Sequence, residues 1–210
     1  MPTETIPAAN ATRRPIQPAR DLALIAVFAG VTAALGLIPP IYVPISPAPI
    51  TAQSLGVILA GAILGGRRGL ASQVLFLALV ALGLPLLSGG RGGIGVFFGV
   101  TWGFLVGWPV VAGLIGLFTY RVGAPYSIWK GTIVNLVFGM VVLYAIGIPG
   151  MVVTGKLGWG AALAANLPYL PGDLIKCVLA AFVAKAVHSA YPGLLPWHGK
   201  DVEPGPQKAS

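Results

Sequence analysis

Two ionisable residues lie within the last apolar stretch of the sequence, in the run Pro171-Gly172-Asp173-Leu174-Ile175-Lys176. Asp173 and Lys176 are three positions apart, so on a helix they share one face. Charged side chains inside such a stretch are costly and by default mark a functional site. A structural alternative exists, because an Asp after Pro-Gly also caps a helix and the lysine then only pairs with it. The pair is the first candidate for contacts with a polar ligand.

Arg91 is a second candidate, and it lies in the glycine-rich segment Ser88-Gly89-Gly90-Arg91-Gly92-Gly93. Glycine-rich loops can cradle phosphates, but this spacing matches neither the P-loop nor the dinucleotide fingerprint. The arginine therefore either binds an anionic group or lies at a membrane interface. Gln53 lies near the start of an apolar segment. We expect this start to lie at the same end of the molecule as Arg91, Asp173 and Lys176, so Gln53 can reach the same site.

No group of residues has the composition of a catalytic or metal site. Three of the five acidic residues lie in the terminal segments, and His188 and His198 have no metal-ligand residues spaced around them. The single cysteine, Cys177, excludes an internal disulfide framework and a cysteine-based zinc cluster. We expect no catalytic residues, no metal and no cofactor. An ATP-binding motif is also missing from the sequence, so any uphill transport must draw its energy from elsewhere.

The composition is that of a membrane protein. Hydrophobic residues make up 56% of the 210 positions, charged residues only 9%, and the mean hydropathy is +0.87. Soluble domains carry about 25% charged residues, because a solvated surface needs them. The net charge of +8 does not indicate nucleic-acid binding, since the basic residues separate apolar runs and do not gather with aromatic residues on one face.

The elements that must position these residues are six apolar segments, at about 22–38, 51–66, 69–87, 97–120, 128–148 and 172–191. Backbone polar groups cannot stay unpaired in hydrocarbon, so each segment must be helical or buried in protein. Strict alternation of apolar and polar residues, typical of a membrane β-barrel, is missing from the sequence. We predict an all-α integral membrane protein with six transmembrane helices. Residues 1–21 and 192–210 form tails, and residues 22–191 form the membrane domain.

Lysine and arginine predict the orientation. With six spans and a cytoplasmic N-terminus, two basic residues lie outside, Arg91 and Lys156, and Lys176 lies within a span. The others lie on the inside: Arg13, Arg14, Arg20, Arg67, Arg68, Arg121, Lys130, Lys185, Lys200 and Lys208. Basic residues concentrate on the cytoplasmic side of membrane proteins. Both termini are therefore predicted to be cytoplasmic.

Small residues form a stripe on the first helix, at Ala26, Ala29, Gly30 and Ala33. Such a stripe lets another helix approach closely. It serves either packing within the bundle or docking of an external subunit. If it is a docking surface, Ala29→Trp should spare ligand binding and block uptake.

Seven short segments between about residues 22 and 190 form an ordered set of motifs: Ile38–Pro44, Ile50-Thr51-Ala52-Gln53-Ser54, Leu59–Gly65, Gly83-Leu84-Pro85, Gly89–Gly93, Gly99–Phe104 and Pro171–Lys176. Taken in this order, they resemble the BioY family, the biotin-specific substrate-binding components of energy-coupling factor (ECF) transporters. Two stretches depart from the family pattern. Trp102 replaces a glycine of the usual G-P-T-G-G-Y motif, and the stretch 76–79 lacks the usual tyrosine.

The resemblance implies a ligand and a set of contacts. Biotin has a ureido group, an apolar ring and a carboxylate. By resemblance, Asp173 accepts the ureido N–H groups, Lys176 donates to the ureido carbonyl and Gln53 adds a polar contact. Such charge-assisted hydrogen bonds are strong in a dry pocket. Three aromatic residues would pack the ring and an arginine would bind the carboxylate: Trp102, Phe97 and Phe98 for the ring, and Arg91 for the carboxylate.

The resemblance also implies partners and a location. Family members work in the bacterial cytoplasmic membrane with a membrane scaffold (T) subunit and two cytoplasmic ATPases. Three alternatives stay open at this point. The chain can recognise another vitamin, act as a membrane-embedded enzyme with Asp173 as base, or serve as a purely structural subunit.

Overall fold

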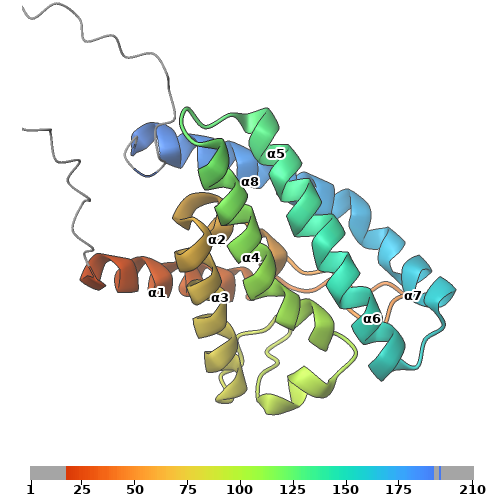
Figure 1. The fold of residues 1–210 in the computed structure, drawn as a ribbon. Helices are drawn as coiled ribbons and strands as arrows, with labels where there is room; N and C mark the ends of the chain where they lie inside the picture. Colours follow the sequence, from red (N-terminus) through yellow and green to blue (C-terminus); the bar gives the residue numbers. More distant parts are fainter. Residues whose placement is uncertain (1–17, 192–193, 195–210) are drawn as a thin grey trace, which may run out of the picture.

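The computed structural model, which describes residues 18–191 and 194, consists of helices joined by loops (Figure 1). In order these are α1 (Pro18–Leu35), α2 (Gln53–Leu64), α3 (Gly66–Ala81), the 3₁₀ helix η1 (Ile94–Phe98), α4 (Trp102–Val122), α5 (Ile128–Leu136), the π-helix η2 (Val137–Val142), α6 (Leu143–Gly155), α7 (Trp159–Asn166), the 3₁₀ helix η3 (Leu167–Tyr169) and α8 (Leu170–Ala190). Because η2 joins α5 directly to α6, residues 128–155 form one continuous rod. The predicted all-helical membrane fold is confirmed. The predicted tails fall almost entirely outside the described residues.

Three of the described helices are long and apolar enough to cross a membrane: α1, α4 and the 128–155 rod. The helix α2 has only 12 residues, about 18 Å at 1.5 Å per residue, against a hydrocarbon core of about 30 Å. Helix α8 has 21 residues, as many as α4, but it carries Asp173, Lys176 and Lys185.

Some predicted boundaries were wrong. The fifth segment was expected to end before Pro149, yet the helix continues through this proline to Gly155. A proline is tolerated inside a membrane helix when neighbours satisfy the freed carbonyl. The stretch 149–171, expected to be a loop, also contains α7. The helix α3 begins earlier than predicted, at Gly66, and ends at Ala81, because Gly83 and Pro85 do not continue it.

Glycines allow the closest helix contacts around α4, which packs on α2, α3 and α6. Gly65 alone joins α2 to α3, with a φ of 82° that favours glycine. A Cβ atom on Gly116 of α4 would overlap the backbone of Gly65 and Gly66. Gly103, also on α4, packs less tightly against the backbone of Ile146 and Gly147. The spacing of these glycines therefore serves packing inside the bundle.

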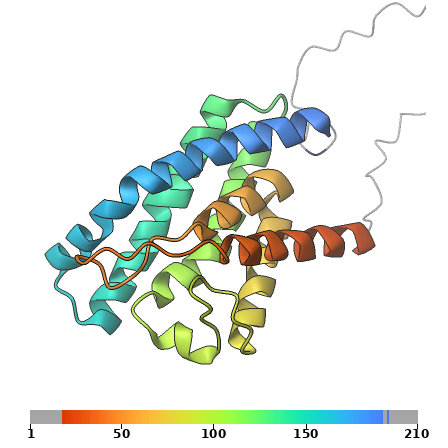
Figure 2. The same ribbon diagram turned by 180° about the vertical axis from the view of Figure 1, so that it is seen from behind.

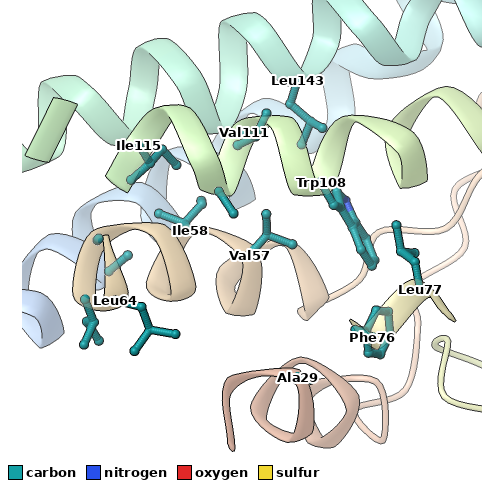
Figure 3. Packing of buried hydrophobic residues seen from close by; sticks show 14 of the residues in the cluster. Ala29, Val57, Ile58, Leu64, Phe76, Leu77, Trp108, Val111, Ile115 and Leu143 are labelled. Atoms are coloured by element: carbon teal, nitrogen blue, oxygen red, sulfur yellow. The ribbon is translucent and has the colours of Figure 1, made fainter. Parts of the chain in front are cut away.

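The apolar core lies where α1, α2, α3 and α4 meet (Figure 3). Trp108 of α4 points towards Phe76 of α3, and their ring centroids are 5.9 Å apart. Val57 and Ile58 of α2 are buried and point towards α4. These contacts fix the first turns of α2 and α4 relative to each other, and both turns carry pocket residues.

The start of α1, the end of α8 and the α2–α3 turn lie at one end of the bundle. Asp21 of α1 forms an ion pair of 2.8 Å with Arg68 of α3, and His188 near the end of α8 lies 2.9 Å from the carbonyl oxygen of Ala62. Figures 1 and 2 accordingly show the described ends of α1 and α8 on the same side of the molecule. The first turns of α2, α4 and α8 therefore meet at the opposite end.

The predicted docking stripe on α1 does not form one surface. Ala29 is only 3% exposed and belongs to the core, and Ala33 is half-buried against it. Ala26 and Gly30 are exposed, and a side chain added at Gly30 would meet no atom within 4 Å. Ala29→Trp is therefore no longer expected to spare binding, because a tryptophan there would disrupt the core.

Candidate functional site

A pocket that is partly open to solvent lies at the end of the bundle where α2, α4 and α8 begin. Its walls come from the 39–52 loop, the turn 87–91 and the first turns of α2, α4 and α8, together with the middle of the 128–155 rod. The lining residues are Ala48, Pro49, Thr51, Gln53, Ser54, Leu87, Arg91, Thr101, Phe104, Leu105, Trp108, Leu143, Tyr144, Asn166, Tyr169, Asp173 and Lys176.

Asp173 is the charged centre of the pocket. One carboxylate oxygen, Oδ1, accepts a hydrogen bond of 2.9 Å from Lys176 Nζ, and the other, Oδ2, accepts one of 2.6 Å from the hydroxyl of Tyr144. The side chains of Asp173 and Lys176 are only 11% and 15% exposed. Each carboxylate oxygen has a further lone pair. Asp173 can therefore accept N–H groups from a ligand without giving up its protein partners.

Lys176 is fully engaged. Its ammonium has three N–H donors, and they meet the carbonyl oxygen of Thr51 at 2.6 Å, Ser54 Oγ at 3.0 Å and Asp173 at 2.9 Å. The lysine thus ties the start of α2 to α8 and neutralises the carboxylate. To donate to a ligand it must exchange one of these bonds, and the hydroxyl of Ser54 is the partner that can rotate.

Gln53 lies in the pocket wall, but its amide serves the protein. Nε2 donates to the carbonyl oxygens of Thr32 and Leu86, at 3.2 and 3.0 Å, and Oε1 accepts from the backbone N–H of Ser88 at 2.8 Å. The side chain is 1% exposed. Gln53 therefore fixes the 84–91 turn against α1. Only the second lone pair of its Oε1 can still accept a hydrogen bond from a ligand.

Arg91 lies at the rim. An isolated bridge to Leu87 closes the turn that carries it, and its Nε donates to the carbonyl oxygen of Ser88 at 3.3 Å. The residue as a whole is exposed and lines the pocket. Its guanidinium can therefore meet an anionic group at the mouth while solvent still reaches it.

The three aromatic residues predicted to pack a ring do not line the pocket. Trp102 instead donates its indole N–H to Thr154 Oγ1 at 2.8 Å, linking α4 to α6. Phe98 is 74% exposed, and Phe97 packs against the core.

The spacing along α4 explains why Trp102 turns away. The residues of α4 and its N-cap that reach the pocket are Thr101, Phe104, Leu105 and Trp108, which follow the i, i+3, i+4, i+7 spacing of one helix face. Position 102 lies about 100° from that face. This periodicity was available in the sequence, and it identifies Phe104 and Trp108 as the aromatic wall.

Tyr144, which donates to Asp173, lies two residues after a π-helical turn of the rod. In such a turn the N–H bonds the carbonyl five residues back, so one more residue fits into it. Buried positions recur every four residues along the rod, at Gly131, Asn135, Gly139, Leu143 and Gly147. In a pure α-helix that spacing drifts by about 40° each time. The wide turn offsets part of this drift, and no local sequence signal predicted it.

Asn166 and Tyr169 also escaped the sequence analysis. Both amide protons of Asn166 are used, by the carbonyl oxygen of Ala162 at 2.8 Å and the sulfur of Met151 at 3.2 Å. Its oxygen is thus the group that the side chain offers to the pocket. Tyr169 ends η3, one residue before α8, and its position four residues before Asp173 was the one available signal.

The arrangement is suited to binding a small molecule. An apolar and aromatic wall, one carboxylate and the side chain of Asn166 line the same pocket, and a cation is at the mouth. Within residues 18–191 and 194, no group of three or more metal-binding side chains comes together. The pocket matches a neutral body with N–H donors at its buried end and an anionic group at its outer end.

Comparison with known proteins identifies the family. The sequence profile of the BioY family matches residues 7–193. The chain belongs to the BioY family. The biotin transporter BioY of Rhizobium etli is 45% identical to it over 183 residues, which cover 84% of this chain and 97% of that protein. The biotin transporter BioY of Rhodobacter capsulatus is 42% identical over 187 residues, covering 84% and 97%.

A solved structure has the same fold. The crystal structure of the S-component for biotin from an ECF-type ABC transporter matches with a TM-score of 0.79 and 30% sequence identity. The match covers 82% of this chain and 93% of that chain. The resemblance found in the motifs of the sequence is therefore confirmed, and this BioY family member has the helical architecture of an S-component.

Proposed function

We propose that this protein binds biotin in the pocket around Asp173 and acts as the substrate-binding subunit in biotin uptake across the bacterial cytoplasmic membrane. The observation that carries the proposal is the buried Asp173–Lys176 pair inside an aromatic pocket, in a member of the BioY family. A buried ion pair that faces a cavity and still has acceptor capacity is suited to a polar, uncharged head group.

Different residues of the pocket contact three parts of the ligand. Asp173 and the oxygen of Asn166 accept the two ureido N–H groups, and Lys176 donates to the ureido carbonyl in exchange for Ser54. Phe104 and Trp108 pack the ring. Arg91 binds the carboxylate at the mouth, where the charge keeps part of its hydration.

The orientation follows from the charges. Of the described basic residues, six lie at or near the end that carries the termini: Arg20, Arg67, Arg68, Arg121, Lys130 and Lys185. Arg91 and Lys156 lie at the pocket end. By the positive-inside rule we therefore infer that the termini are cytoplasmic and that the pocket faces the outside. Arg13, Arg14, Lys200 and Lys208, which were also predicted to be cytoplasmic, lie outside the described residues. Energy for uptake comes from partners, a membrane scaffold subunit and two ATPases.

Calorimetric titration tests the ligand. Biotin added to detergent-purified protein prepared without biotin should bind saturably with a stoichiometry near one. Thiamine and riboflavin are the controls, because neither has a carbonyl flanked by two N–H groups, and they should neither bind nor compete. If a folded, monodisperse sample binds one of these vitamins and not biotin, the assignment is wrong.

The exposed face of α1 is the proposed docking surface for the scaffold subunit. Gly30→Trp projects from this face into open space, so biotin binding should stay unchanged while uptake by cells falls at least about tenfold. Leu179→Trp, on the exposed face of α8, is the matched control and should leave uptake intact. Normal uptake by the Gly30→Trp variant would show that partners dock elsewhere.

A further inference from the structure

The loop between α1 and α2 forms one wall of the pocket and is closed at its base. Ile41 and Ile50 exchange two backbone hydrogen bonds, of 2.9 and 2.8 Å. Residues 42–49 form the tip beyond this bridge. Ala48 and Pro49 of the tip line the pocket, so a ligand held there lies against the inner side of the loop.

The tip is fastened to the body of the protein by one side chain. The hydroxyl of Tyr169 donates to the carbonyl oxygen of Ala48 and lies 2.5 Å from Ser46 Oγ. Because the single proton of Tyr169 is used on Ala48, the serine hydroxyl must be the donor between the two hydroxyls. Ser46 Oγ in turn accepts the backbone N–H of Ala48 at 3.3 Å. The result is a closed ring of hydrogen bonds in which each hydroxyl donates once and accepts once.

Little else holds the tip. Among the described residues, the hydrogen bonds from residues 42–49 to the rest of the protein all go to Tyr169. Tyr42 and Ile45 are 71% and 59% exposed, so their side chains add little apolar burial. A segment with few buried contacts opens at a low free-energy cost. The closed ring of hydrogen bonds at Tyr169 therefore sets much of the free-energy barrier to opening of the tip.

We propose that Tyr169 is a positioning residue that latches the 42–49 tip over the pocket and thereby sets how long the ligand stays bound. The proposal rests on the proposed function, because it concerns the same pocket. The aromatic side chain of Tyr169 belongs to the pocket wall, and its hydroxyl holds the loop by hydrogen bonds. Ala48 and Pro49 stay against the pocket until the hydrogen bonds to Tyr169 break, so the hydroxyl is expected to slow release more than it changes capture.

The test uses Tyr169→Phe, which keeps the aromatic wall and removes the latch. Labelled biotin is bound to the purified protein and chased with excess unlabelled biotin. The dissociation rate should rise about tenfold, while the association rate changes less than about threefold. Tyr42→Phe removes an exposed hydroxyl from the same loop and should leave both rates unchanged. Release from Tyr169→Phe at the wild-type rate overturns the latch.

Ser46→Ala provides an independent variant, because this residue is half-buried on the loop and outside the core. It should also speed release, and the double variant should release biotin no faster than Tyr169→Phe alone, since both changes open the same ring. Rates that multiply in the double variant would overturn the closed ring.

A measurement without biotin separates the latch from the proposed function. In an Ala48→Cys background, labelling by a polar maleimide reports opening of the tip, because Ala48 is 9% exposed and the native Cys177 is fully buried. Adding Tyr169→Phe should raise the labelling rate at least about fivefold, whereas adding Tyr42→Phe should not. An unchanged rate overturns the latch even if biotin binds as proposed, and a raised rate supports it even if biotin does not bind.

Discussion

Asp173→Asn should abolish measurable biotin binding, with a loss of affinity of at least about 100-fold. The asparagine loses the negative charge and replaces one acceptor oxygen with an N–H₂ donor. Hydrogen bonds to a charged group contribute about 1.5–3 kcal/mol each, and two of them correspond to roughly a factor of 100 or more. Titration of biotin into the purified variant measures the loss. Wild-type affinity in Asp173→Asn would remove Asp173 from the site.

A double variant separates binding from folding. In Asp173→Asn, Lys176 keeps its charge in a site where its side chain is 15% exposed and the carboxylate is gone. Breaking a buried pair from one side is destabilising, so the melting temperature should fall. Asp173→Asn combined with Lys176→Met removes the leftover charge and should recover much of the stability without restoring biotin binding. A double variant that binds biotin tightly would show that the pair serves only the fold.

Gly116→Leu should prevent the protein from folding. A Cβ atom at this position would overlap the backbone of Gly65 and Gly66, and backbone cannot move aside as a flexible side chain can. Helix α4 would have to separate from the α2–α3 turn, which exposes the core between them. The measurement is the yield of monodisperse protein after size-exclusion chromatography, and we expect it to be near zero.

Gly30→Leu is the matched control, because it places the same side chain on a membrane helix where no atom lies within 4 Å. It should be produced and should bind biotin as the wild type does. If Gly116→Leu is also produced and monodisperse, α4 does not pack against the α2–α3 turn as described.

The sequence by itself determined the class, the family and the charged pair. Apolar segments separated by basic residues predict membrane helices, because lipid cannot form hydrogen bonds with exposed backbone groups. Asp173 and Lys176 are neighbours for a local reason, since positions three apart on a helix share a face. The motif order was likewise sufficient to indicate the BioY family. None of these conclusions needed a contact between distant segments.

Only the tertiary structure decided which segments meet at the pocket. Tyr169 meets Ser46 across 123 positions of sequence, and no periodicity connects them. Tyr144 of the 128–155 rod meets Asp173 of α8 across 29 positions.

Burial and hydrogen bonding on α1 and α2 were decided in the same way. The small residues of α1 looked alike in sequence, yet Ala29 lies in the core and Gly30 lies on the surface. From the sequence, the amide of Gln53 could have bound a ligand. In the fold it is hydrogen-bonded to three backbone groups from α1 and the 84–91 turn. Hydropathy depends on residue type, whereas the direction of a side chain depends on how whole helices rotate and pack. The sequence therefore predicts the bundle, and the packing of the bundle selects the site.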